Sequence, residues 1–399
     1  MIIVFLLCIS LVVLSLVTSK NNFLAPGVIT SAVWIIVLSL FWLLHHNLPP
    51  LSTKFLVSLS IWISILCITS LLIQSVNFKI ENPEPSQFVR NIFFWISILT
   101  FPMFLLFVRD ALALGDSGSW STDLRLAALG QTKHFKEVYD GIHIIIWQVS
   151  YTIELFYLSK KNRSKVIVLI IIILAFGFLT MSKIVFLDFF VKTICILFFK
   201  NKVSIKHFFL GLVVLLLSFV ALQSIRTSIE MDSDDRNDFV VLYLLSSMPA
   251  FDTVLPGTAY NWGEDVFRLY YAVTYKLGIS DVKPIEPILP FIHKPVFTNT
   301  YTIMYPFYKD FGYWGVGIFA LLYGFILGWI FKKAQKGSVL YILIFSTLAL
   351  SIVLQYVAEV LLTNLSGFLK QIVILSLPFF ASKYKIFEKQ KFISLKNNG

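Results

Sequence analysis

The chain has 399 residues, of which 57% are apolar and only 14% are charged, and its mean hydropathy is +0.82. Soluble globular domains carry about 25% charged residues, so this composition excludes a soluble enzyme, a secreted domain and a disordered protein. The apolar runs are long enough for helices rather than for the strands of a barrel, and they predict an integral membrane protein. The meaning of the net charge of +11 depends on where the charges lie along the chain.

Apolar runs of the length that crosses a bilayer core as a helix, about 20 residues, recur along the chain. We expect an all-α, polytopic fold with about eleven transmembrane helices (10–12). The first run lacks a basic segment and a cleavage site, and is interpreted as a retained span rather than a signal peptide. The runs are 2–18, 27–46, 54–75, 88–108, 141–159, 165–181, 183–199, 206–224, 311–331, 338–356 and 365–382.

Lysine and arginine residues are concentrated in four short segments. If the chain crosses the membrane eleven times, all four segments lie on the same side. The rule that positive loops are cytoplasmic then puts the N-terminus outside and the C-terminus inside. This distribution explains the net charge without nucleic acid. The four segments are 160–165, 200–206, 332–336 and 383–396.

The same topology predicts three regions. Residues 1–224 form an N-terminal membrane bundle with an outer loop at 109–140. Residues 225–310 form a large outer loop, whose length favours a functional role. Residues 311–399 form C-terminal membrane helices and a basic cytoplasmic tail.

Two apolar-rich segments of the large outer loop, 239–248 and 266–277, are too short to span. We expect them to lie at the interface or to pack on the bundle. Between the eighth run and these segments, Asp232 and Asp234 spell D-x-D. This pattern binds a divalent ion in some glycosyltransferases, but the signal is weak and a solvated, capping or Arg-paired loop is the favoured interpretation.

Three cations, Arg109, Lys183 and Arg226, fall at the outer ends of predicted spans. Arginine suits a diphosphate because its planar fork bonds two oxygens at once. The alternative is that these side chains simply anchor helix ends.

Ionisable groups inside predicted spans are costly and therefore informative. Asp188 and Lys192 are spaced to pair on one helix. Glu154 suits either a proton relay or an ion pair with the 160–165 cluster.

The stretch from Thr298 to Gly315 combines hydroxyls, aromatic rings, one acid and glycines where the chain re-enters the membrane. Such rings are typical of the membrane interface, and beside hydroxyl and carboxylate groups they also suit a sugar. Asp310 could cap the following helix. The sequence contains no Walker loop, no metalloprotease motif and no spaced set of metal ligands, so we expect neither a cofactor nor a metal.

At this stretch the chain resembles the bacterial O-antigen and capsule repeat-unit polymerases, the Wzy-type glycosyltransferases. Residues 298–302 (TNTYT), followed by 308–312 (YKDFG) and Gly315, are similar to a signature of that family. The order of spans, the large outer loop and the basic tail are also similar. Residues 180–183 (TMSK) resemble the family's Ser-Arg turn, with Lys183 in place of arginine.

The resemblance implies a GT-C-like architecture and a specific reaction. On the outer face of the bacterial cytoplasmic (inner) membrane, a glycan on undecaprenyl diphosphate is transferred to a lipid-linked repeat unit. A chain-length regulator and a flippase of the same pathway are the expected partners. The alternatives are an O-antigen ligase and, from another class, a lipid-linked oligosaccharide flippase or other secondary transporter.

The implied roles fall on three groups of residues. Undecaprenyl diphosphate leaves with negative charge, which cations would stabilise, and the acceptor hydroxyl needs a base. The candidates are Asp310, His293 and Glu264 for the base, Arg226, Arg109 and Lys183 for the diphosphate, and Thr298, Asn299, Tyr301 and Tyr305 for the sugar.

Overall fold

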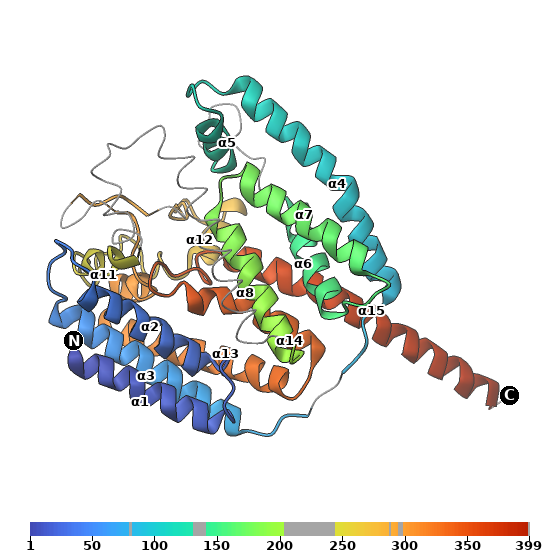
Figure 1. Ribbon diagram of the computed structural model, residues 1–399, viewed down its shortest axis with the longest axis horizontal. Helices are drawn as coiled ribbons and strands as arrows, with labels where there is room; N and C mark the ends of the chain where they lie inside the picture. Colours follow the sequence, from blue (N-terminus) through green and yellow to red (C-terminus); the bar gives the residue numbers. More distant parts are fainter. Residues whose placement is uncertain (80–81, 131–140, 203–243, 287–288, 294–297, 398–399) are drawn as a thin grey trace. The chain divides into compact units, whose positions relative to one another are not determined.

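The computed structural model describes residues 1–79, 82–130, 141–202, 244–286, 289–293 and 298–397 (Figure 1). The all-α prediction is confirmed, since this part of the chain contains thirteen helices and a single isolated bridge between Ile292 and Thr298. The D-x-D aspartates lie outside the described residues.

Among the described residues, five helices are long and apolar enough to cross a membrane, which supports a multi-span membrane protein. They are α2 (Pro26–Leu43), α3 (Thr53–Ser75), α4 (Gln87–Leu114), α13 (Tyr305–Gln335) and the Leu365–Ser382 part of α15 (Leu365–Asn397).

The other predicted spans coincide with shorter helices of 15 to 17 residues, except 206–224, which lies outside the described residues. The number eleven therefore stays a prediction. The shorter helices are α1 (Ile2–Thr18), α6 (Ile142–Phe156), α7 (Arg163–Leu179), α8 (Lys183–Phe199) and α14 (Val339–Val353).

Three short helices occupy the predicted outer loops. They are α5 (Trp120–Ala128), α11 (Ser247–Phe251) and α12 (Arg268–Lys276). All five residues of α11 are buried. Its part of the predicted 239–248 segment therefore packs within the protein instead of lying at the interface.

The chain divides into two compact units. The first unit comprises the described residues of Met1–Lys79, Asp232–Lys336 and Leu348–Phe368. The second unit comprises those of Ile80–Met231, Gly337–Thr347 and Leu369–Gly399.

In the first unit, α13 packs along α3, while α1 and α2 pack against each other and against α3 (Figure 1). Two glycines on α13 permit the close approach. A Cβ added at Gly324 would lie 2.6 Å from the Leu66 carbonyl oxygen, and one at Gly328 would lie 2.9 Å from Ser70 Cα. Small residues four apart commonly let membrane helices approach closely.

A kink at Gly312 separates a short first segment of α13 from its long apolar remainder. Gly312 has φ of 62° and ψ of −148°, a combination open almost only to glycine. The chain folds back tightly at this point, so that a Cβ at Gly315 would lie 2.2 Å from the Phe307 carbonyl oxygen. The glycines of the signature thus shape the entrance of α13.

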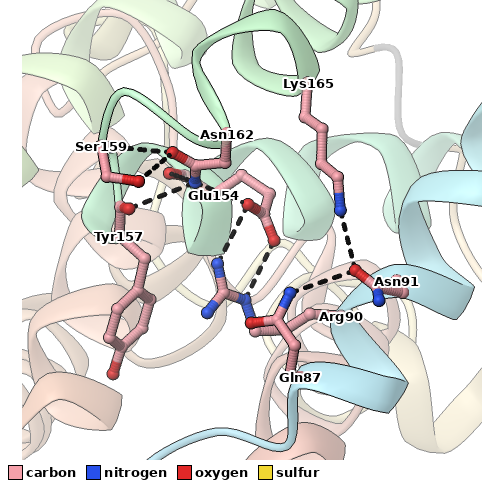
Figure 2. Close-up of polar contacts among 8 residues, drawn as sticks. All are labelled: Gln87, Arg90, Asn91, Glu154, Tyr157, Ser159, Asn162 and Lys165. Carbon is pink, nitrogen blue, oxygen red and sulfur yellow. Dashed lines mark hydrogen bonds and ion pairs between the residues drawn. The ribbon is translucent and has the colours of Figure 1, made fainter.

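The second unit contains a buried ion pair between α4 and α6 (Figure 2). Arg90 donates two hydrogen bonds to the Glu154 carboxylate, at 2.9 and 3.0 Å, and its guanidinium lies 4.5 Å from the centre of the Tyr157 ring. Asn162 adds a third hydrogen bond to Glu154, at 2.8 Å. Glu154 is thus paired, although its partner is Arg90 and not a cation of the 160–165 cluster.

The predicted pair on α8 also forms. Lys192 Nζ lies 2.6 Å from Asp188 Oδ2, and Lys192 is 2% exposed. Its ammonium also donates to the Gln148 and Gln371 side chains, at 3.4 and 3.5 Å. Four polar side chains thus share one buried position inside this helical unit.

Candidate functional site

A cavity of about 240 Å³, lined by both polar and apolar residues, lies within the first unit. It is bounded by the segment that leads into α13, the residues before α12, residues 285, 286 and 289, and the turn before α15. Its lining is Asp265, Ile285, Glu286, Leu289, Asn299, Thr300, Tyr301, Thr302, Tyr305, Pro306, Val357, Ala358, Glu359 and Thr363.

Three of the four predicted sugar-binding residues line this cavity: Asn299, Tyr301 and Tyr305. The rings of Tyr301 and Tyr305 lie 4.5 Å apart between centroids, tilted by 37°. The Tyr301 hydroxyl donates to the Pro290 carbonyl at 3.3 Å. Both rings are therefore held in place at the cavity wall.

The fourth predicted residue, Thr298, is not part of the lining but supports it. Its hydroxyl is 2.8 Å from that of Thr300 and 3.1 Å from that of Ser246. Its backbone pairs with Ile292, with N–H to carbonyl distances of 2.9 and 3.1 Å. Thr298 thus fixes the strand-like start of the segment, which Pro306 then turns into α13.

The opposite wall is a break between two apolar helices. Helix α14 ends at Val353 and α15 begins at Leu365. Non-helical backbone near membrane helices is stable only where other groups satisfy it. Gln355 makes several of the hydrogen bonds that satisfy this backbone. Its carbonyl accepts from the Ile303 N–H at 2.8 Å. Its side chain accepts from the Trp62 indole at 3.2 Å and donates to the Thr30 carbonyl at 3.3 Å.

Glu359 organises the second half of this break. Its carboxylate accepts the N–H groups of Leu362 and Thr363, both at 2.8 Å, and the Thr363 hydroxyl at 3.0 Å. The Tyr323 hydroxyl, from the buried face of α13, donates to the same carboxylate. Both carboxylate oxygens therefore have two donors each.

Two adjacent contacts join the residues before α12 to the first turns of α13. Lys309 Nζ lies 2.7 Å from Asp265 Oδ2, and the Val266 N–H donates to Asp310 Oδ2 at 3.0 Å. Asp265 is 4% exposed, so the Lys309 charge compensates a buried carboxylate. Lys309 also lies 5.7 Å from the centre of the Tyr305 ring.

Arg268 closes the cavity on the side of α12. Its Nε donates to the Ile285 carbonyl and its Nη1 donates to the Thr363 carbonyl, both at 2.8 Å. Both acceptors belong to lining residues. The planar guanidinium therefore joins Ile285 to the turn before α15.

Thr302 carries a hydroxyl that faces a ligand-sized space without a partner in the described part of the chain. The residue is fully buried, it lines the cavity, and its Oγ1 has no hydrogen bond there. Buried hydroxyls are normally satisfied, and exceptions point to a bound water or ligand.

The three predicted bases do not line the cavity. Asp310 accepts from the Val266 N–H, as described above, and its carboxyl contacts that of the lining residue Asp265, while His293 is exposed. Glu264 accepts the N–H groups of Tyr260 and Asn261, at 2.9 and 3.0 Å. Burial would raise the pKa of Glu264, but these hydrogen bonds and one from the Asn261 side chain outweigh it, and the pKa lies below its usual value. Glu264 therefore acts as an ionised cap of its loop.

The predicted diphosphate ligands are not among the described residues of the first unit. Arg109 on α4 and Lys183 at the start of α8 belong to the second unit. Arg109 is exposed and lies 2.7 Å from Asp110. Arg226 lies outside the described residues.

Sequence reasoning missed Asp265, Arg268, Lys309 and Glu359. Each is an ordinary charged residue near the end of an apolar segment, and their convergence follows from the tertiary fold. Within the described residues no group of three or more His, Cys, Asp or Glu side chains is arranged to hold a metal ion.

Comparison of the chain with known protein families, with characterised proteins and with solved structures finds no match.

Proposed function

We propose that this protein is a Wzy-type polymerase of lipid-linked oligosaccharide repeat units and that the cavity of the first unit binds a sugar of its substrate. The observation that carries the proposal is the meeting of Asn299, Tyr301 and Tyr305 in one cavity. Aromatic rings beside amide, hydroxyl and carboxylate groups suit a sugar ring, which has apolar faces and a polar edge. Asn299 and Tyr301, which belong to the stretch that resembles the family signature, thus line a cavity that suits such a ligand.

Two further properties of the cavity support this function. Its volume of about 240 Å³ is below the range of about 300–1,000 Å³ typical of sites for drug-sized ligands, and suits one sugar residue of a longer glycan. Its lining also comes from 265–306 and 357–363, segments that the charge distribution predicts on the outer side of the membrane. Lipid-linked repeat units are joined on that side.

In the proposed reaction the nascent glycan leaves undecaprenyl diphosphate and is joined to the terminal sugar of a lipid-linked repeat unit. Arg226, Arg109 and Lys183 are proposed to stabilise the diphosphate as it departs. The site would lie in the bacterial cytoplasmic membrane, where a flippase supplies the repeat units and a chain-length regulator sets the product length.

Complementation of a polymerase-deleted strain of the source organism tests the proposal, with surface glycan read as a ladder on a gel. The wild-type gene should restore the ladder. Asn299→Ala and Tyr305→Ala should leave only single repeat units at equal protein levels. Tyr260→Ala is the matched control, because that ring is 95% exposed, and it should restore the full ladder. A normal ladder from both cavity variants would contradict the proposed site.

The diphosphate role has its own test. Arg226→Ala should leave the protein inserted in the membrane yet abolish long polymer. The acceptor distinguishes the related activities: transfer of finished glycan to a lipid A core would indicate a ligase, and translocation without chain growth would indicate a flippase.

A further inference from the structure

Three carboxylates line the cavity: Asp265, Glu286 and Glu359. If the cavity holds the acceptor sugar, as the proposed function requires, one of them is placed to take the proton of the attacking hydroxyl. General bases act through direct or water-mediated hydrogen bonds of about 2.6–3.2 Å. The choice among the three follows from what each carboxylate already binds.

Glu359 has no capacity left for this role. Four donors occupy its two oxygens: the Tyr323 hydroxyl, the N–H groups of Leu362 and Thr363, and the Thr363 hydroxyl. Protonation of Glu359 would break contacts that hold the turn before α15. Its role is to position that turn.

The Glu286 carboxylate is available to accept a proton, but its side chain is not held in one orientation. Its side chain is exposed, and in the described part of the chain it has no hydrogen bond or ion pair. A solvated carboxylate on a loop samples many rotamers, and holding it in one geometry costs side-chain entropy. Catalysis requires a group already held in place.

Asp265 is both oriented and buried. Its side chain is 2% exposed and pairs with Lys309 at 2.7 Å. The next residue, Val266, is fixed through its N–H to Asp310 at 3.0 Å. Lys309 stands on the first segment of α13, only four residues after the cavity-lining Tyr305. Two adjacent contacts thus set both the backbone and the side chain of Asp265.

A second observation indicates that a ligand completes this site. The buried Thr302 hydroxyl lines the same cavity and has no partner in the described residues. A sugar hydroxyl would satisfy it, because hydroxyls both donate and accept. Asp265 and Thr302 therefore line the same cavity. The Asp265 carboxylate is placed to accept a proton, and the Thr302 hydroxyl is placed to hold the sugar ring.

We propose that Asp265 is the general base of the polymerisation reaction and that Lys309 is its positioning residue. This inference rests on the proposed function. The acceptor hydroxyl oxygen forms the new bond to the anomeric carbon of the nascent glycan as its proton passes to the Asp265 carboxylate. The bond between that carbon and the diphosphate oxygen breaks, and its electron pair leaves with undecaprenyl diphosphate. Asp265 then releases the proton to water.

The test uses the full-length protein in lipid nanodiscs with lipid-linked repeat units extracted from the source organism. Asp265→Asn should lower kcat by about 10²–10⁴-fold with little change in KM. Asp281→Asn, at an exposed position that does not line the cavity, is the matched control and should keep both the kcat and the KM of the wild type.

A charge-balanced variant covers the case in which Asp265→Asn does not fold because Lys309 is left buried without its partner. Asp265→Asn/Lys309→Met removes both charges, which buried pairs commonly tolerate. It should fold and remain inactive. Either Asp265→Asn variant retaining more than a tenth of wild-type kcat, or a comparable loss in Asp281→Asn, would overturn the role of Asp265. A wild-type protein that joins no repeat units would overturn the proposed function as well.

Discussion

The guanidinium of Arg268 donates a hydrogen bond of 2.8 Å to the Thr363 carbonyl while its Nε donates one of equal length to the Ile285 carbonyl. One side chain therefore joins two walls of the cavity that are distant in sequence. The geometry depends on a planar fork, which lysine does not have.

We expect Arg268→Lys to lose one of these two bonds and to destabilise the first unit by about 1.5–3 kcal/mol, the usual contribution of a hydrogen bond to a charged group. Polymer length should fall with it. Thermal unfolding in detergent and the glycan ladder measure the two effects. Arg163→Lys, at an exposed position at the start of α7, is the control. Equal melting temperatures for the two variants would contradict the joining role.

Gly312→Ala tests the kink in α13. With φ of 62° and ψ of −148°, an added Cβ introduces backbone strain of about 1–3 kcal/mol. The melting temperature should fall accordingly. Gly317→Ala serves for comparison, since its Cβ would make ordinary contacts with Ile65 Cδ1 at 3.4 Å and Ile61 Cγ2 at 3.7 Å. If both variants melt with the wild type, the kink is not required.

A double-mutant cycle measures the interaction energy of the Arg90–Glu154 ion pair in the second unit. Arg90→Met leaves a buried carboxylate and Glu154→Met leaves a buried guanidinium, so each should cost about 3–5 kcal/mol. The double variant removes both charges and should be far more stable than the sum of the single losses. Additive losses in unfolding experiments would show that the two residues do not interact.

Glu264 predicts a pH dependence of stability. Its pKa is depressed in the folded protein, so its contribution is present above the unfolded-state pKa and is lost as the pH falls through the folded-state value. Glu264→Gln should therefore melt below the wild type at pH 6, and the difference should close as the pH is lowered below 4.5, the ordinary pKa of glutamate. A difference that is constant with pH would exclude an ionised cap.

The helices and the segment that leads into α13 were predictable because their signals are local. Apolar runs of fixed length predict the long helices, and TNTYT before Pro306 combines β-branched residues with a helix-starting proline. Asp265 and Glu359 were not predictable, because their roles depend on Lys309 and Tyr323, which approach them only in the folded chain. Asp310 and Glu264 attracted attention as isolated acids, but isolated acids near turns most often accept backbone N–H groups, as both do here.

Gln355 connects the cavity wall to α2 and α3 through hydrogen bonds. Through this residue, Trp62 on α3 and Thr30 on α2 are each one hydrogen bond away from the residue whose carbonyl holds Ile303, next to Thr302. Membrane helices tilt when their apolar length and the bilayer thickness differ. A tilt of α2 or α3 would move the cavity wall through these bonds, so we expect the activity to depend on lipid chain length.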